Sequence, residues 1–205
     1  KKQESKLYTG DLQEDDMENR YYKAVGSSFT KPARAFHIFL KRHLLLGSVS
    51  GVFQNVSLMD MSAGRGGDLH NMFNCKVENM YLLDLDKENL GSENDSSDKD
   101  TMYGRIQNIK EQALTKRHNK KALWANDSSF TILQGNMGED LTSKPELKDS
   151  KTDELVKVDC IPNFFSIHYI FNKEKSVEQL LKNVASFLKP NGIFIVTTFD
   201  GEKIF

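Results

Sequence analysis

Cysteine is scarce in this chain. Two cysteines, Cys75 and Cys160, occur in 205 residues, and neither belongs to a C-x-x-C pair. Two cysteines are too few for a disulfide framework, and isolated cysteines of this kind are typical of a reducing compartment. We therefore expect an intracellular protein.

The chain also lacks long apolar runs and a dominant charge. No run approaches the roughly 18 apolar residues that predict a membrane-spanning helix, and the start, K-K-Q-E-S, is not that of a signal peptide. We expect no membrane partner. The formal net charge is −1, so any contact with nucleic acid must be local. Because the chain begins without Met, we expect a fragment of a longer polypeptide.

The stretch from Val56 to Asp84 predicts how the rest of the chain is organised. A short apolar run ends in Asp60, small residues follow from Ser62 to Gly67, and apolar residues then recur at helical spacing. Strand, glycine turn and helix open a nucleotide-binding βαβ unit, in which glycine lets the backbone turn sharply against a ligand. A second apolar run ends in Asp84, roughly twenty residues past the turn, where such units place a ribose-binding carboxylate.

The turn also indicates what kind of ligand it holds. It is not the full G-x-G-x-x-G motif, since Ser62 stands at the first glycine position. A tight turn without any ligand is the simplest alternative, but the acid that ends the second strand favours a binding site. Asp68 opens the following helix, where it would repel a pyrophosphate. This favours S-adenosylmethionine over a dinucleotide.

Further strands and helices are expected to alternate along the chain. Residues 1–30 are polar and predict an N-terminal arm, and residues 31–205 predict one domain with polar insertions near 91–128 and 138–155. We expect further strands at Phe130–Leu133, Val156–Ile161 and Ile193–Thr198. We expect helices at Ala33–Leu46, ended by Gly47, at Met102–Leu114, and at Val177–Leu188 behind a Ser176–Gln179 capping box. The alternation predicts the α/β class with a doubly wound, mostly parallel sheet.

Polar side chains stand where these strands are expected to end. In doubly wound sheets, ligands bind beyond the carboxyl ends of the strands, next to the point where the strand order reverses. Asp60, Asp84, Asn136 and the stretch Phe164–Tyr169 all fall at such ends. Their convergence predicts a ligand site at this edge. A basic run at Lys116–Lys121 is either a solvated helix end or a surface that faces RNA.

Four motifs resemble one known family, the mRNA cap (guanine-N7) methyltransferases. D-M-S-A-G-R-G-G-D-L at Asp60–Leu69 matches the family's D-x-G-x-G-x-G-G-D-L, and S-I-H-Y-I-F at Ser166–Phe171 matches its His-Tyr-x-Phe pattern. R-A-F-H-I-F-L-K at Arg34–Lys41 resembles the family's N-terminal helix, and T-T-F-D-G at Thr197–Gly201 is the fourth match. The D-G-E-K ending and the isoleucine before His168 most resemble the methyltransferase domain of capping enzymes from large DNA viruses.

The resemblance implies a fold, a reaction and partners. The fold would be the Rossmann-like one of class I S-adenosylmethionine-dependent methyltransferases, with the family's C-terminal strands absent from this chain. The reaction would be methyl transfer to N7 of the 5′ cap guanine of mRNA, with S-adenosylhomocysteine as product. The partners would be the capped mRNA 5′ end and other domains of a larger capping enzyme. The location would be host cytoplasm or virion for a viral protein, and the nucleus for a cellular one.

The resemblance also assigns roles to single residues, without a metal or a catalytic acid or base. The residues implied to bind the cofactor are Lys41, Asp60, Ser62, Gly64, Asp84, Asn136, Met137, Phe164 and Tyr169. Those implied to face the cap guanine and its triphosphate are His37, Arg65, Asn71 and His168. The chain departs from the family pattern at Ser62, where the family has Gly, at Asn136, where it has an acid, at Phe164, where it has Gln, and at His37, where Asn is common.

Three other functions are consistent with parts of the sequence. The same fold could methylate another small molecule or a protein. A non-catalytic, methyltransferase-like subunit could bind RNA or a partner, which the loss of Gln at Phe164 favours. A dinucleotide-dependent oxidoreductase is disfavoured by Asp68 and by the lack of a recognisable hydride-transfer site.

Overall fold

The computed structural model describes residues 31–53, 55–94, 97–115 and 128–200. The chain divides into two compact units, residues 1–40 and 41–205. Helix α2 (Lys31–Val49) has residues in both units. The predicted arm and the basic run at 116–121 lie outside the described residues. The domain boundary expected after residue 30 stays a prediction.

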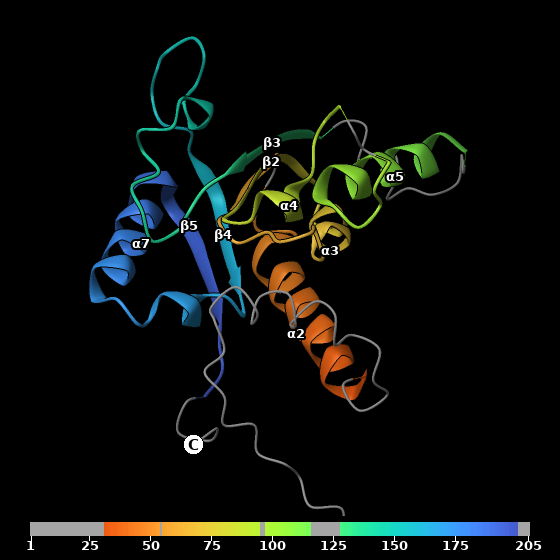
Figure 1. Ribbon diagram of the computed structural model, residues 1–205, viewed down its shortest axis with the longest axis horizontal. Helices are drawn as coiled ribbons and strands as arrows, with labels where there is room; N and C mark the ends of the chain where they lie inside the picture. The colour runs from red at the N-terminus through yellow and green to blue at the C-terminus, as the bar shows by residue number, and fades with distance from the viewer. Residues whose placement is uncertain (1–30, 54, 95–96, 116–127, 201–205) are drawn as a thin grey trace, which may run out of the picture. The chain divides into compact units, whose positions relative to one another are not determined.

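The described part of the second unit is built around a five-stranded sheet (Figure 1). Its strands are β1 (Val56–Asp60), β2 (Val77–Asp84), β3 (Ser129–Gln134), β4 (Val158–Phe164) and β5 (Leu188–Thr197). They lie in the order β3-β2-β1-β4-β5, and each neighbouring pair is parallel. This order confirms the doubly wound sheet, and its direction reverses between β1 and β4.

Alternate residues of the strands contribute to two hydrophobic cores, one on each face of the sheet. Leu58, Leu82 and Cys160 belong to the first core. Their neighbours Met59, Leu83 and Ile161 belong to the second. The first core also takes side chains from α3 (Leu69–Asn74), α4 (Lys87–Leu90) and α5 (Met102–Thr115), and the second from α7 (Glu174–Phe187).

Helices therefore cover both faces of the sheet, and Figure 1 shows α7 on the side opposite α3 and α5. Because helices cover both faces, the central strands β1 and β4 are buried along their whole length. The arrangement leaves the carboxyl ends of the strands as the edge at which a ligand can reach the sheet.

The predicted strands and helices are present, but several have different bounds. Helix α2 continues through Gly47 to Val49, so the expected stop at Gly47 is wrong. The capping box is wrong as well, because α7 begins at Glu174 and the backbone N–H of Ser176 already donates to Lys173 O at 2.9 Å. Strand β5 begins at Leu188, directly after α7.

Strand β4 starts later than expected and continues past Ile161 to Phe164. It passes through Pro162, which has no N–H to donate. The ladder between β1 and β4 pairs Leu58 with Cys160, so the proline lies beyond that pair, and on the other side it pairs with Ile195 of β5. The longer strand carries Asn163 and Phe164 to the edge where the site was predicted.

The two polar insertions contain ordered structure. The segment 91–128 includes α5. The segment 138–155 contains a short 3₁₀ helix, η2 (Pro145–Leu147), and buries Leu141 and Leu147 completely in the second core.

Candidate functional site

The turn after β1 is held by the carboxylate that ends β2. Asp84 accepts hydrogen bonds from the backbone N–H of Gly64 at 2.7 Å, from the N–H of Asp86 at 3.0 Å, and from Asn89 Nδ2 at 3.2 Å. Gly64 has φ 54°, in the left-handed region that favours glycine. Because three donors fix Asp84, its carboxylate lies against the glycine turn that follows β1, and β1 borders the point where the strand order reverses.

Asp60 is the buried acid of the site, with 4% of its surface exposed. It accepts hydrogen bonds from Ser62 N at 3.0 Å and from Ser62 Oγ at 3.3 Å. Burial and the nearby charge of Asp68 raise the pKa of Asp60 to about 7, although the Ser62 backbone hydrogen bond and Lys41 lower it. A nearby cation favours the ionised form of such a carboxyl group.

The raised pKa of Asp60 predicts how the stability of the protein depends on pH. The folded carboxyl group, with a pKa of about 7, holds its proton more tightly than the unfolded one, with a pKa of 3.8. The free energy of unfolding therefore gains a contribution that is present below about pH 4 and is lost as the pH rises to about 7, at up to about 1.4 kcal/mol per pH unit. Asp60→Asn should remove this contribution, which urea unfolding of both proteins across the range measures. Identical pH dependence in both proteins would rule it out.

Two serine hydroxyls join the turn to the end of β4. Ser166 Oγ lies 2.7 Å from Ser62 Oγ and 2.8 Å from Asn163 Oδ1. Asn163 Nδ2 in turn donates to Met137 Sδ at 3.3 Å. The hydroxyl that Ser62 adds at a glycine position therefore has hydrogen-bond partners, and the bonds link the turn, β4 and the segment after β3.

Lys41 lies against the first turn of α3. Its Nζ is 2.8 Å from Asp68 Oδ2, and both side chains are largely buried. The same ammonium group lies 5.6 Å from the ring centroid of Phe164 and 5.9 Å from that of Phe165. The ion pair and the rings keep Lys41 near the glycine turn, and its contact with a cofactor stays a prediction.

Asn136 and Met137 follow β3 at the same edge. Asn136 Oδ1 accepts from Gly138 N at 2.9 Å, and its Nδ2 donates to Glu139 Oε1 at 3.1 Å. An amide oxygen has two lone pairs, so Asn136 keeps one for a ligand. Met137 is buried, with its sulfur held by Asn163.

His168 and Tyr169 lie in the short 3₁₀ helix η3 (Ile167–Ile170) after β4. The His168 ring centroid is 4.2 Å from that of Tyr169 and 5.2 Å from that of Phe199. Within the described ranges, the buried Nδ1 of His168 has no hydrogen-bond partner. Burial also lowers the pKa of His168, which favours the neutral imidazole. A histidine satisfied within the core would have a partner for this nitrogen. The cap contact of His168 stays a prediction.

The other residues predicted to contact the cap have different hydrogen-bond partners and positions. Arg65 Nε donates to Asn89 Oδ1 at 2.9 Å, beside the turn. Asn71 is buried in α3, and its Nδ2 lies 3.4 Å from Asp68 Oδ1. His37 belongs to the first unit. The cap contacts of all three stay predictions.

Sequence reasoning missed three polar residues that hold the site together: Asn89, Asn163 and Ser166. Asn89 bonds both Asp84 and Arg65, from a helix of four residues that no periodic pattern marked. Ser166 stands in the S-I-H-Y-I-F motif and within the predicted stretch Phe164–Tyr169, but no role of its own was predicted for it.

No group of three or more His, Cys, Asp or Glu side chains suited to a metal occurs among the residues that the structure describes. No helix in the same ranges is long and apolar enough to cross a membrane.

The second glycine of the turn is constrained by its surroundings. Gly66 has φ +77°, and a Cβ there would lie 2.7 Å from Leu69 Cδ1 and 2.8 Å from Met102 Sδ. Gly66→Ala should therefore lower the free energy of unfolding by about 1–3 kcal/mol. Gly67→Ala is the matched control, since a Cβ on Gly67 meets nothing within 4 Å. Chemical denaturation measures both, and equal stabilities would contradict this description of the turn.

Known proteins match the chain in three comparisons. Residues 26–205 match the model of the mRNA (guanine-N(7))-methyltransferase domain. The chain is 28% identical over 188 residues to the "Probable mRNA-capping enzyme" of Acanthamoeba polyphaga mimivirus. This match covers 89% of the present chain and 15% of the mimivirus protein. It is 27% identical over 153 residues to the mRNA cap guanine-N(7) methyltransferase of Debaryomyces hansenii. That match covers 72% of the present chain and 27% of the yeast protein.

Among solved structures, the chain resembles a S-adenosylmethionine-dependent methyltransferase from Clostridium acetobutylicum. The TM-score is 0.45 at 13% sequence identity, and the match covers 88% of this chain and 54% of the other. A likeness at this level has no bearing on the reaction.

Proposed function

Because the chain belongs to the mRNA (guanine-N(7))-methyltransferase family, we propose that it transfers a methyl group from S-adenosylmethionine to N7 of the guanine that caps mRNA. The observation that carries the proposal is the position of Asp84 against the backbone N–H of Gly64, 2.7 Å apart in the turn after β1, the strand that borders the switch point of the sheet. This is where a doubly wound fold binds a nucleoside.

The cofactor would lie across the carboxyl ends of β1, β2 and β3. Asp84 would accept the ribose hydroxyls, and Asn136 with Met137 would frame the adenine. Lys41 would meet the methionine carboxylate, and the backbone of Ser62 and Gly64 would approach the same part of the cofactor. The ring of Phe164 stands where the family has Gln, 5.6 Å from the Lys41 ammonium.

Three further residues would stabilise the positive charge of the cofactor or contact the substrate. Buried Asp60 would offset the positive sulfonium. The imidazole of His168, in η3 beside the Tyr169 ring, would form a hydrogen bond with the edge of the cap guanine. Arg65 would contact the cap triphosphate, since a guanidinium group matches phosphate geometry.

The transfer needs positioning and no general base. The lone pair of guanine N7 would attack the methyl carbon while the carbon–sulfur bond breaks, and that electron pair would stay on sulfur. The positive charge would move from the sulfonium to the methylated guanine, and no proton would be transferred. Holding N7, carbon and sulfur in line can contribute on the order of 7–11 kcal/mol.

The proposed function also implies a partner and accompanying domains for this chain. Its partner would be the capped 5′ end of mRNA, inside the cell or virion where caps are made. The mimivirus relative is several times longer than this chain, since the match covers 15% of it. Other domains of a larger capping enzyme would therefore accompany this one.

Methyl transfer from labelled S-adenosylmethionine to two RNAs tests the proposal, one capped with GpppN and one with ApppN. We expect label on the guanine-capped RNA alone. Equal labelling of both, or of uncapped RNA, would favour a methyltransferase with another substrate. No transfer, together with no binding of S-adenosylhomocysteine, would favour a non-catalytic RNA-binding subunit.

A further inference from the structure

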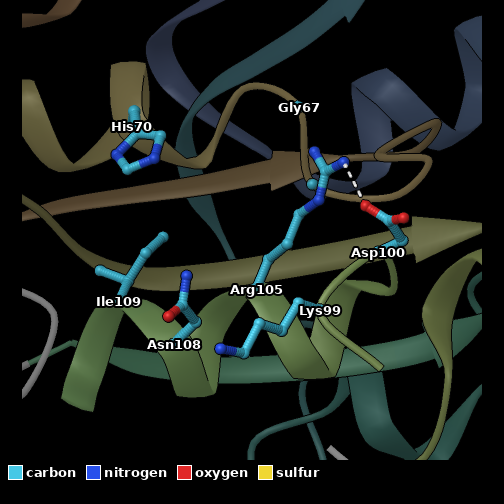
Figure 2. Close-up of a pocket in the computed structure, with 8 residues that line it drawn as sticks. Gly67, His70, Lys99, Asp100, Arg105, Asn108 and Ile109 are labelled. Carbon is cyan, nitrogen blue, oxygen red and sulfur yellow. Dashed lines mark ion pairs between the residues drawn. The ribbon is translucent and has the colours of Figure 1, made fainter. Parts of the chain in front are cut away.

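A hollow of about 240 Å³ lies beside the glycine turn, between α3 and α5 (Figure 2). No residue that lines it was predicted to bind the cofactor or the cap. The lining residues are Gly66, Gly67, His70, Lys99, Asp100, Arg105, Asn108 and Ile109. Except for Ile109 and the two glycines, they present charged or hydrogen-bonding side chains.

The charge of the hollow is locally positive in a chain whose net charge is −1. Lys99 and Arg105 contribute two cations, and Asp100 is the one carboxylate among the described lining residues. Its Oδ1 lies 3.7 Å from Arg105 Nη2, and 78% of the Asp100 side chain is exposed. An ion pair this long and exposed contributes little, so Arg105 can exchange Asp100 for another anion at small cost.

The hollow also leaves open space next to the backbone of Gly67, where a ligand could lie. Gly67 forms part of its wall, and a Cβ added there would meet no atom within 4 Å. His70 from α3 and Asn108 from α5 place polar side chains on its two sides, as Figure 2 shows. Two cations with polar side chains nearby suit a phosphate group.

The position of the hollow, next to Arg65 in the chain, favours RNA as the source of that phosphate. Arg65, the residue proposed to meet the cap triphosphate, directly precedes Gly66 in the hollow's wall. We propose that the hollow binds a phosphodiester of the RNA chain that follows the cap. This inference rests on the proposed function and adds to it a contact that a bare cap dinucleotide lacks.

Arg105→Ala and Lys99→Ala test the inference, with Lys182→Ala as the matched control. Lys182 is exposed on α7, which packs on the other face of the sheet, so its loss removes the same charge elsewhere. The dissociation constants of a capped RNA of about ten nucleotides and of GpppA are measured at several salt concentrations. Thermal unfolding of each variant verifies the fold, and Lys99, which is exposed, provides a test if Arg105→Ala does not fold.

We expect each hollow variant to bind the capped RNA about 3–10-fold more weakly and to lose clearly less affinity for GpppA. The slope of log K against log salt for the RNA should fall by about 0.7, the value for one phosphate contact to a single strand. Lys182→Ala should bind both ligands as the parent does.

Three results would overturn the inference. The first is an equal loss of affinity for GpppA and for capped RNA, and the second is no loss for either. The third is a loss of binding of inorganic phosphate, added as a separate ligand, without any change for RNA, because this would indicate a site for a small free anion. Failure of the parent protein to methylate any guanine cap would instead contradict the proposed function.

Discussion

Asp84→Ala is expected to weaken the binding of S-adenosylmethionine at least about a hundredfold. A carboxylate that accepts both ribose hydroxyls makes two charge-assisted hydrogen bonds, each typically contributing about 1.5–3 kcal/mol. The same side chain accepts from the Gly64 backbone at 2.7 Å, so the substitution also releases the turn on which the cofactor would lie. Isothermal titration with S-adenosylmethionine and S-adenosylhomocysteine measures the loss.

Asp86→Ala is the matched control for this substitution. Asp86 carries the same charge two residues further on, and its carboxylate accepts from Glu88 N at 2.8 Å, as the N-cap of α4. Losing a cap lowers stability by about 1 kcal/mol, and cofactor affinity should stay near that of the parent. Cofactor binding that survives Asp84→Ala in a folded protein would remove Asp84 from the cofactor site.

Tyr169→Ala is expected to slow methyl transfer much more than it weakens cofactor binding. Tyr169 is 60% exposed in η3, and its ring lies 4.2 Å from the His168 ring, centroid to centroid. We expect it to close over the methyl donor and keep it in line with guanine N7. Because a small misplacement of reacting groups can cost about a hundredfold in rate, kcat should fall by about 10–100-fold, while the Kd for S-adenosylmethionine changes only a few-fold.

Phe171→Ala separates this effect from the loss of an exposed ring. Phe171 is 55% exposed just after η3 and lies outside the predicted site. Single-turnover rates and cofactor titrations of the two variants should differ, with Phe171→Ala close to the parent in both. If Tyr169→Ala instead raised the Kd and left the single-turnover rate unchanged, Tyr169 would bind the cofactor without aligning it.

The local pattern of the sequence predicted the parts of the site that lie at strand ends. Alternating apolar runs indicated where β1 and β2 stop, and so placed Asp60 and Asp84 at one edge of the sheet. The carboxyl ends of parallel strands share an edge, so the order of the elements was enough to bring these acids together.

Contacts between distant segments could not be predicted in this way. The bond between Ser62 and Ser166 joins residues 104 positions apart, and nothing in the spacing of either residue indicates the other. The hollow next to Gly66 likewise depends on how α3 and α5 pack, since Arg105 and His70 belong to different helices. The end of β4 was missed because Pro162 is a strand breaker in local terms, whereas in the structure it pairs with Ile195 of β5.

The position of the transferred methyl group tests the central claim most directly. Capped RNA labelled by the protein is digested with nuclease, and the released cap is separated by liquid chromatography with mass spectrometry. We predict that all of the label is recovered as N7-methylguanosine in the cap structure, and that Asp84→Ala gives none. Label on a ribose hydroxyl, on another base or on the cap phosphates would contradict the account.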